Sequence, residues 1–247
     1  MEISRTSICK YIDHTNVKAD ATEEDIKELC QEAIKYKFHS VCVTPYRVKI
    51  AAEELGEISR QARDDNNGDR DDNKKPAIIC VIGFPFGFTT TQEKINEGKT
   101  AIKDGATEID MVQNIGAVKE GNFEFVQEEI HQIVEAIAPV KLKVIMEIGF
   151  LTKEELIESC KRAKSAGAAF VKSSTGYGPR VPTPEDIKIM REAVGSELGV
   201  KASGGIHTFD QAKAMIEAGA TRLGTSSALR IIGIVEEELK DKAGSKE

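Results

Sequence analysis

The sequence predicts an α/β protein with a single domain spanning residues 1–247, folded as a (β/α)8 TIM barrel. Two observations support this. Short runs of apolar and β-branched residues alternate with amphipathic helical segments along the whole chain. The length of 247 residues is also typical of one α/β barrel. Eight strand-helix units, at a mean spacing of roughly 30 residues, therefore favour a closed barrel.

Eight segments are expected to form the strands. Each is continuously apolar rather than strictly alternating, as is typical of parallel strands buried on both faces. They are residues 9–13, 40–44, 77–82, 108–112, 142–148, 169–172, 199–202 and 222–225. An open doubly wound sheet is the alternative fold, but no G-x-G-x-x-G motif follows the first strand.

Helices between the strands are predicted by helical spacing of apolar residues and by N-cap signals. The cap signals are Thr22 with Asp25, Thr152 with Glu155, Thr183 with Pro184, and Thr208 with Gln211. Further helices are expected at about residues 46–61, 90–104, 122–137 and 226–242.

One segment departs from this rhythm. Residues 64–75, DDNNGDRDDNKK, are expected to form a charged surface insertion between the second helix and the third strand. A calcium loop is the sharper interpretation, but the glutamate that an EF-hand needs at its twelfth position is missing.

Composition excludes several classes of partner. Lys and Arg number 34 against 41 Asp and Glu, giving a net charge of −7, which disfavours nucleic acid and anionic membranes. The five cysteines are an odd number without a C-x-x-C, which indicates reduced thiols rather than disulfides or zinc. No signal peptide and no membrane span is recognised, so we expect a cytoplasmic protein.

Two motifs that could bind a ligand fail on spacing. Gly98-Lys99-Thr100 resembles the end of a P-loop, but residue 93 is Glu rather than Gly and the segment is helical. The four histidines do not lie at metal-ligand spacing, so each is expected to be solvated or hydrogen-bonded.

Lysines near the ends of two successive strands are the main chemical signal. Lys172 ends an apolar run, and Lys201 lies within the next strand. They could be structural cations paired with Asp110 or Glu147, because buried lysine is rare unless paired or functional. Alternatively they form a Schiff-base pair, in which a second ammonium within about 4–6 Å and burial lower the pKa of a nucleophilic amine. Adjacent strands, about 4.8 Å apart, allow this separation.

The loops after the seventh and eighth strands carry a second signal. Ser203-Gly204-Gly205 and Gly224-Thr225-Ser226-Ser227 each precede a helix. Glycines allow close backbone approach, and these two loops are a recurrent phosphate site in barrels. Together they predict that a phosphate group binds here.

Several motifs together resemble the 2-deoxyribose-5-phosphate aldolase family of class I aldolases, over residues 11–232. They are Ile12-Asp13-His14-Thr15, Ser40-Val41-Cys42-Val43, Gly83-Phe84-Pro85-Phe86-Gly87, Glu108-Ile109-Asp110-Met111-Val112, the run from Phe170 to Gly176, the run from Val200 to Ile206, and Gly224-Thr225-Ser226-Ser227.

The resemblance implies that Lys172 forms the Schiff base, that Lys201 keeps its amine reactive, and that Asp110 belongs to the proton relay. It implies a phosphorylated sugar as substrate, neither metal nor cofactor, and a homo-oligomer, often a dimer. It also places Asp13 and Thr15 near the substrate hydroxyls and Cys42 near the pocket. The phosphate and sugar positions that it implies are Thr175, Gly176, Gly204, Gly205, Gly224, Ser226 and Ser227.

The chain departs from the family pattern at two points. Tyr177 stands where some bacterial members carry a lysine near the phosphate, and no tyrosine follows Tyr177 to act as the C-terminal proton shuttle of some members. A different sugar-phosphate aldolase and a non-catalytic phosphosugar-binding protein remain the alternatives. The second explains the set of Lys172, Lys201 and Asp110 less well, because a binding protein needs no acid–base groups.

Overall fold

The computed structural model describes residues 3–64 and 75–234. Its eight strands are parallel and form a closed barrel in sequence order, with β1 paired to β8, which confirms the predicted fold and excludes an open sheet. The strands are β1 (Ile12–Asn16), β2 (Ser40–Val43), β3 (Ala77–Ile82), β4 (Glu108–Val112), β5 (Lys141–Ile145), β6 (Phe170–Lys172), β7 (Gly199–Ser203) and β8 (Arg222–Thr225).

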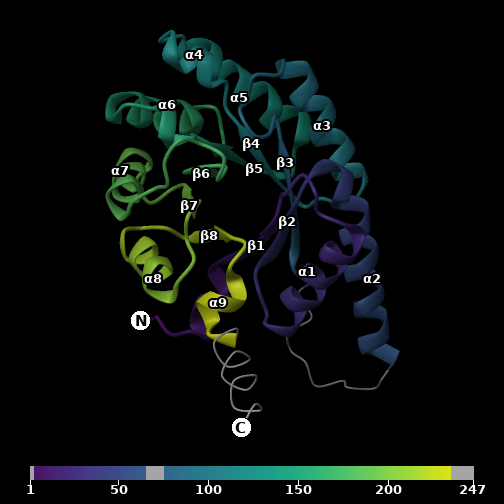
Figure 1. Ribbon diagram of the computed structural model, residues 1–247. Coiled ribbons are helices and arrows are strands. Elements are labelled where there is room, and N and C mark those ends of the chain that lie inside the picture. The colour runs from purple at the N-terminus through teal and green to yellow at the C-terminus, as the bar shows by residue number, and fades with distance from the viewer. Residues whose placement is uncertain (1–2, 65–74, 235–247) are drawn as a thin grey trace.

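Helices surround the barrel (Figure 1). They are α1 (Glu23–Lys35), α2 (Val48–Asp64), α3 (Thr91–Lys103), α4 (Ile115–Lys119), α5 (Phe123–Ile137), α6 (Lys153–Ser165), α7 (Pro184–Val194), α8 (Phe209–Glu217) and α9 (Ala228–Ile232). The capping boxes at Thr22, Thr152, Thr183 and Thr208 all form. The short helix α4 was not predicted, and the end of the helix expected at 226–242 lies outside the described residues.

Two predicted strand boundaries are wrong. Residues Ser7–Tyr11 form a 3-10 helix, so β1 begins at Ile12 and Asp13 lies inside the strand rather than at its end. The fifth strand stops at Ile145 instead of reaching 148, because Glu147 adopts the left-handed conformation with φ 52°. A non-glycine residue in that conformation is strained and ends the strand.

The barrel interior has an apolar part and a charged part. The outward-facing side chains of the strands join the helices in the main hydrophobic core. Inside the barrel, Cys42, Ile79 and Val81 of β2 and β3 form a separate small cluster, against which Val17 and Phe84 pack. Inward positions on the remaining strands carry charged residues, so the fold gathers ionisable groups inside the barrel.

The expected charged insertion at 64–75 cannot be followed in the structure. Asp64 ends α2, and residues 65–74 lie outside the described residues.

Candidate active site

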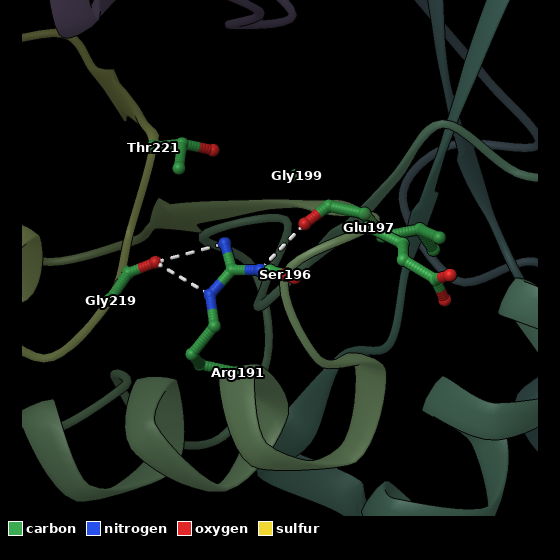
Figure 2. Close-up of a pocket in the computed structure, with 7 residues that line it drawn as sticks. Arg191, Ser196, Glu197, Gly199, Gly219 and Thr221 are labelled. Atoms are coloured by element: carbon green, nitrogen blue, oxygen red, sulfur yellow. Dashed lines mark hydrogen bonds between the residues drawn. The ribbon is translucent and has the colours of Figure 1, made fainter.

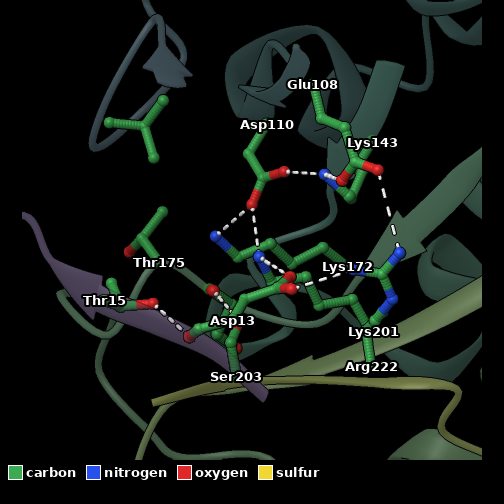
Figure 3. Close-up of polar contacts among 12 residues, drawn as sticks. Asp13, Thr15, Glu108, Asp110, Lys143, Lys172, Thr175, Lys201, Ser203 and Arg222 are labelled. Atoms are coloured by element: carbon green, nitrogen blue, oxygen red, sulfur yellow. Dashed lines mark hydrogen bonds and ion pairs between the residues drawn. The ribbon is translucent and has the colours of Figure 1, made fainter. Parts of the chain in front are cut away.

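A buried charge cluster fills one side of the barrel interior (Figure 3). It contains three carboxylates facing four cationic side chains. The carboxylates and Lys143, Lys172 and Lys201 are at most 7% exposed, and the side chain of Arg222 is 11% exposed. The members are Asp13, Glu108, Asp110, Lys143, Lys172, Lys201 and Arg222.

The strand register brings the cations together. Lys172 of β6 is the direct partner of Lys201 of β7, and Lys201 is in turn opposite Arg222 of β8. Neighbouring strands in a sheet lie about 4.8 Å apart, so these side chains project into the barrel at close range. Lys172 is the last residue of β6, so it lies at the C-terminal end of the barrel.

Asp110 is the centre of the cluster. Its Oδ2 accepts hydrogen bonds from Lys172 Nζ at 2.9 Å and Lys201 Nζ at 2.8 Å, and its Oδ1 accepts one from Lys143 Nζ at 2.9 Å. Burial raises the pKa of the Asp110 carboxyl, but Lys143, Lys172 and Lys201 outweigh this effect and hold it well below its ordinary value. Asp110 is therefore ionised at neutral pH.

Lys201 lies between two carboxylates. Its Nζ is 2.8 Å from Asp110 Oδ2 and 2.6 Å from Asp13 Oδ2. Burial lowers the pKa of Lys201, yet Asp110 and Asp13 outweigh burial and raise it. Lys201 is thus a permanent ammonium group directly beside Lys172.

Asp13 is held by three donors. Ser40 Oγ and Arg222 Nη1 reach its Oδ1 at 2.7 and 3.0 Å, and Lys201 reaches its Oδ2. Burial raises its pKa, but Lys201, Lys143 and Arg222 lower it to about 2. Asp13 is therefore close to the lysines, as expected, and its ion pair with Lys201 holds that ammonium group in place.

Cationic groups outnumber carboxylates in the cluster. With every group ionised, four positive charges face three negative charges. The cations therefore repel one another more than the three carboxylates offset, in a site of low dielectric. Of the three lysines in the cluster, Lys172 has the fewest carboxylate partners among the described residues, because it contacts Asp110 alone.

The other residues expected around the substrate occupy several positions. Cys42 faces the barrel interior with Ile79 and Val81, and burial raises the pKa of its thiol. Thr15 donates its hydroxyl to the carbonyl of Asp13 at 2.8 Å. The pairing of Glu147 with a lysine, which the sequence had allowed, is not seen within residues 3–64 and 75–234. Glu147 instead accepts hydrogen bonds from the N–H of Thr175 at 2.9 Å and from the Thr175 hydroxyl.

The loops after β6, β7 and β8 meet beside Lys172. Ser173 Oγ donates to Ser203 O at 3.0 Å, and Thr225 Oγ1 donates to Ile206 O at 2.7 Å, which fixes the loops to one another. Gly204 and Gly205 have φ values of 98° and 70°, which glycine adopts without strain.

The N–H groups of Gly204, Gly205 and Ser226 make no hydrogen bond to any residue in the described part of the chain, so they remain available to an anion. The N–H of Ser227 is instead bonded to Thr225 Oγ1, and its hydroxyl to His207. Gly176 lies in the loop after β6, and Gly224 lies within β8, where a Cβ would be 3.0 Å from Cε of Lys201.

Other parts of the described chain show no competing site. No group of three or more His, Cys, Asp or Glu in residues 3–64 and 75–234 is arranged to hold a metal. No helix there is both long and apolar enough to cross a membrane. His14 faces away from the interior and is hydrogen-bonded to Glu32 at 2.6 Å, in line with the expectation of a hydrogen-bonded histidine.

A cavity of about 370 Å³ lies on the opposite face, where α7 and α8 lead into β7 and β8 (Figure 2). Arg191 in its wall donates to the carbonyls of Gly195, Leu198 and Gly219 at 2.6–3.1 Å. Its guanidinium thereby ties two loops together, and we assign it a structural role.

Comparison with known proteins decides the family. A family model described as DeoC/LacD family aldolase matches residues 7–234. The chain belongs to this aldolase family.

Its relatives include deoxyribose-phosphate aldolases from Thermococcus gammatolerans and Aciduliprofundum boonei. They are 51% and 52% identical, over 91% and 93% of this chain and 95% and 97% of the relatives.

Solved structures in the family share the fold. An aldolase named QR15 superposes with a TM-score of 0.81 at 36% identity, covering 96% of this chain and 97% of that one. A deoxyribose phosphate aldolase from Aeropyrum pernix, described as a tetramer, gives 0.78 at 29% identity, covering 95% and 93%.

Sequence reasoning missed three members of the cluster, Glu108, Lys143 and Arg222. Lys143 lies in the alternating stretch Lys141-Leu142-Lys143, which by itself looks like a solvated strand edge. The signal that identifies it is spacing: Glu108 and Asp110, two residues apart on β4, face the same interior as Lys143, which is paired in register with Asp110.

Proposed function

We propose that this protein is a class I aldolase that reversibly cleaves 2-deoxy-D-ribose 5-phosphate to D-glyceraldehyde 3-phosphate and acetaldehyde, in deoxyribonucleoside catabolism. The observation that carries the proposal is the placement of Lys172 and Lys201 on the same oxygen of Asp110. One amine can act as a nucleophile while the other stays charged, a combination that simple ligand binding does not require.

In the first step, the neutral amine of Lys172 attacks the C1 aldehyde of the open-chain sugar. A C–N bond forms, the carbonyl oxygen leaves as water, and one proton taken up from solvent water makes the product a protonated imine. Lys201, which shares the same Asp110 oxygen, stays the charged neighbour of this amine. The protonated imine then accepts electrons from C2.

In the second step, the C3 hydroxyl proton is removed and the C2–C3 bond breaks. We assign proton transfer to Asp110 with Lys201, through a water molecule, because Asp110 is ionised and lies 2.9 Å from the reacting amine. Glyceraldehyde 3-phosphate leaves with a C3 aldehyde, and the electron pair of the broken bond remains in an enamine on Lys172.

In the last step, the enamine carbon takes up one proton, and water hydrolyses the resulting imine to acetaldehyde and free Lys172. The imine accepts the electron pair throughout, so the mechanism calls for no metal or organic cofactor. The loops after β6, β7 and β8 hold the substrate.

We assign the phosphate to the N–H groups of Gly204, Gly205 and Ser226, which face no protein acceptor among the described residues. Ser226 also borders a cavity of about 190 Å³ whose walls include Glu28 and Glu32. Those carboxylates repel phosphate, which favours the glycine side of the loops.

Product analysis tests the proposed function. Incubation with 2-deoxy-D-ribose 5-phosphate should give equal amounts of acetaldehyde and glyceraldehyde 3-phosphate by NMR, before and after EDTA treatment. D-ribose 5-phosphate and ketose phosphates serve as comparison substrates. Faster cleavage of another sugar phosphate would assign a different aldolase, and binding without cleavage would indicate a phosphosugar-binding protein.

We propose a cytoplasmic homodimer as the working form of the enzyme. The five cysteines are all free thiols, which suits a reducing compartment. At the surface Phe88 stacks on Phe86, Phe86 meets Phe150 edge to face, and Phe88 is 80% exposed, so self-association would bury an apolar patch. Light scattering after gel filtration should give twice the mass of 27.0 kDa, whereas four times that mass would match the tetrameric relative.

A further inference from the structure

Residues 176–183, the later part of the segment between β6 and α7, lie across the open end of the barrel, and we refer to them as the lid. It contacts loops on both sides of β6. A Cβ placed on Gly149, after β5, would lie 2.8 Å from Pro179, and one on Gly205, after β7, would lie 2.6 Å from Val181. The lid therefore rests closely on both neighbouring loops.

Tyr177 extends from the lid to the far side of the barrel. Its hydroxyl donates to the carbonyl of Val17, which follows β1, at 3.1 Å. Its ring meets Phe84, which follows β3, edge to face at 5.5 Å. In the closed order of strands, β1 and β3 are both separated from β6 by at least two other strands, so this side chain bridges the opening.

The base of Tyr177 is anchored at the opposite rim. Its N–H donates to Thr175 Oγ1 at 3.0 Å, and Thr175 is held by the buried carboxylate of Glu147. Gly176, between them, has φ 93° and open space around its Cα, so it can act as a hinge. The bridge thus has one fixed end and one end secured by a single hydrogen bond and a ring contact.

The groups beneath the bridge are closed to solvent. Lys172 is 4% exposed, Asp110 and Cys42 are fully buried, and Val17 and Phe84 pack on the apolar cluster of Cys42, Ile79 and Val81. A substrate cannot reach the amine of Lys172 unless part of this cover moves. Tyr177 is itself 47% exposed, so moving its side chain into water does not require opening the hydrophobic core.

We propose that Tyr177 controls access of the substrate to Lys172: its hydroxyl bond to Val17 and its contact with Phe84 close the barrel, and release of both opens it. The proposal rests on the proposed function only for the identity of the substrate. It assigns Tyr177 a positioning and access role and no part in the chemical steps.

Reductive methylation measures this access without depending on aldolase activity. Formaldehyde and cyanoborohydride convert accessible amines to methylamines, and peptide mass spectrometry gives the rate for each lysine. Lys49, whose side chain is 72% exposed, serves as the internal reference. The variants are Tyr177→Phe, which removes the hydroxyl alone, and Tyr177→Ala, which also removes the ring. Tyr36→Phe makes the same change beyond the end of α1, away from the opening.

Loss of one net hydrogen bond shifts a two-state equilibrium about fivefold, so Tyr177→Phe should raise the methylation rate of Lys172 about fivefold. Tyr177→Ala should raise it further, and Tyr36→Phe and the rate at Lys49 should match the wild type. Equal Lys172 rates in wild type and both Tyr177 variants would overturn the proposal.

Turnover of deoxyribose 5-phosphate separates access from chemistry. An access role predicts that Tyr177→Phe keeps kcat and raises kcat/KM, because more of the enzyme is open. A tenfold or greater fall in kcat with unchanged methylation would make Tyr177 a proton donor and refute the proposal. If the wild type does not cleave this sugar, the proposed function fails, whereas the methylation rates still decide the role of Tyr177.

Discussion

The substitution Asp110→Asn tests whether one carboxylate holds the buried charge cluster together. It preserves the size of the side chain and removes its charge. In the wild type, Asp110 accepts from Lys143, Lys172 and Lys201 at 2.8–2.9 Å. The asparagine amide would point two hydrogens at ammonium groups, and it leaves Lys172 with no carboxylate partner among the described residues.

The expected cost follows from these contacts. Lys143 keeps Glu108 at 2.7 Å and Lys201 keeps Asp13 at 2.6 Å, so the substitution breaks part of a network rather than all of it. Removing one partner of a buried ion pair costs about 3–5 kcal/mol, of a total stability of about 5–15 kcal/mol. For a chain of this size we expect the Tm to fall by roughly 10 °C.

The assay is urea unfolding followed by circular dichroism, at pH 7.5 and at lower pH. Glu23→Gln, which removes an exposed carboxylate paired with Lys27, serves as the control and should leave the unfolding midpoint close to that of the wild type. The stabilities of the wild type and of Asp110→Asn should converge as the pH falls through the lowered pKa of Asp110, because a protonated aspartate resembles asparagine. A loss below about 1 kcal/mol at pH 7.5 would refute the central role of Asp110.

Three further outcomes follow from the same cluster. Lys172→Met should abolish turnover yet leave the urea midpoint unchanged or higher, since four cations face three carboxylates; a large loss of stability would contradict this charge count. Lys201→Met should lower stability by about 3 kcal/mol and kcat at least a hundredfold, measured on folded protein, because Asp13 and Asp110 lose their shared partner. Stability from Asp13, whose pKa is lowered to about 2, should be complete above pH 4 and be lost as the pH falls toward 2, removing about 2 kcal/mol. If urea titrations show no such loss of stability between pH 4 and pH 2, the ion pair between Asp13 and Lys201 is excluded.

The fold was predictable because its signals are local. Apolar runs and N-cap pairs such as Thr152 with Glu155 depend on neighbouring residues, and the corresponding strands and helices form as expected. The predicted first strand began too early, because residues 9–11 look apolar enough for a strand. In the structure these residues belong to a 3-10 helix, and pairing with β2 begins at Asp13.

The candidate site was predictable only in part. Lys172, Lys201 and Asp110 follow from the strand ends and from family resemblance, and the structure brings these three together. Lys143 and Arg222 depend on which face of a strand points inward, and a shift of one residue in register reverses that face. Glu147 looked equivalent to Asp110 in the sequence, yet its left-handed backbone directs its carboxylate to Thr175 instead.

Borohydride trapping tests the central claim most directly. Enzyme incubated with 2-deoxy-D-ribose 5-phosphate and sodium borohydride should carry one reduced adduct per chain, and peptide mapping should place it on Lys172, with Lys172→Met giving none. An adduct at Lys201 or Lys143, or no adduct from an enzyme that still cleaves the sugar, would contradict the Schiff-base mechanism proposed for this barrel.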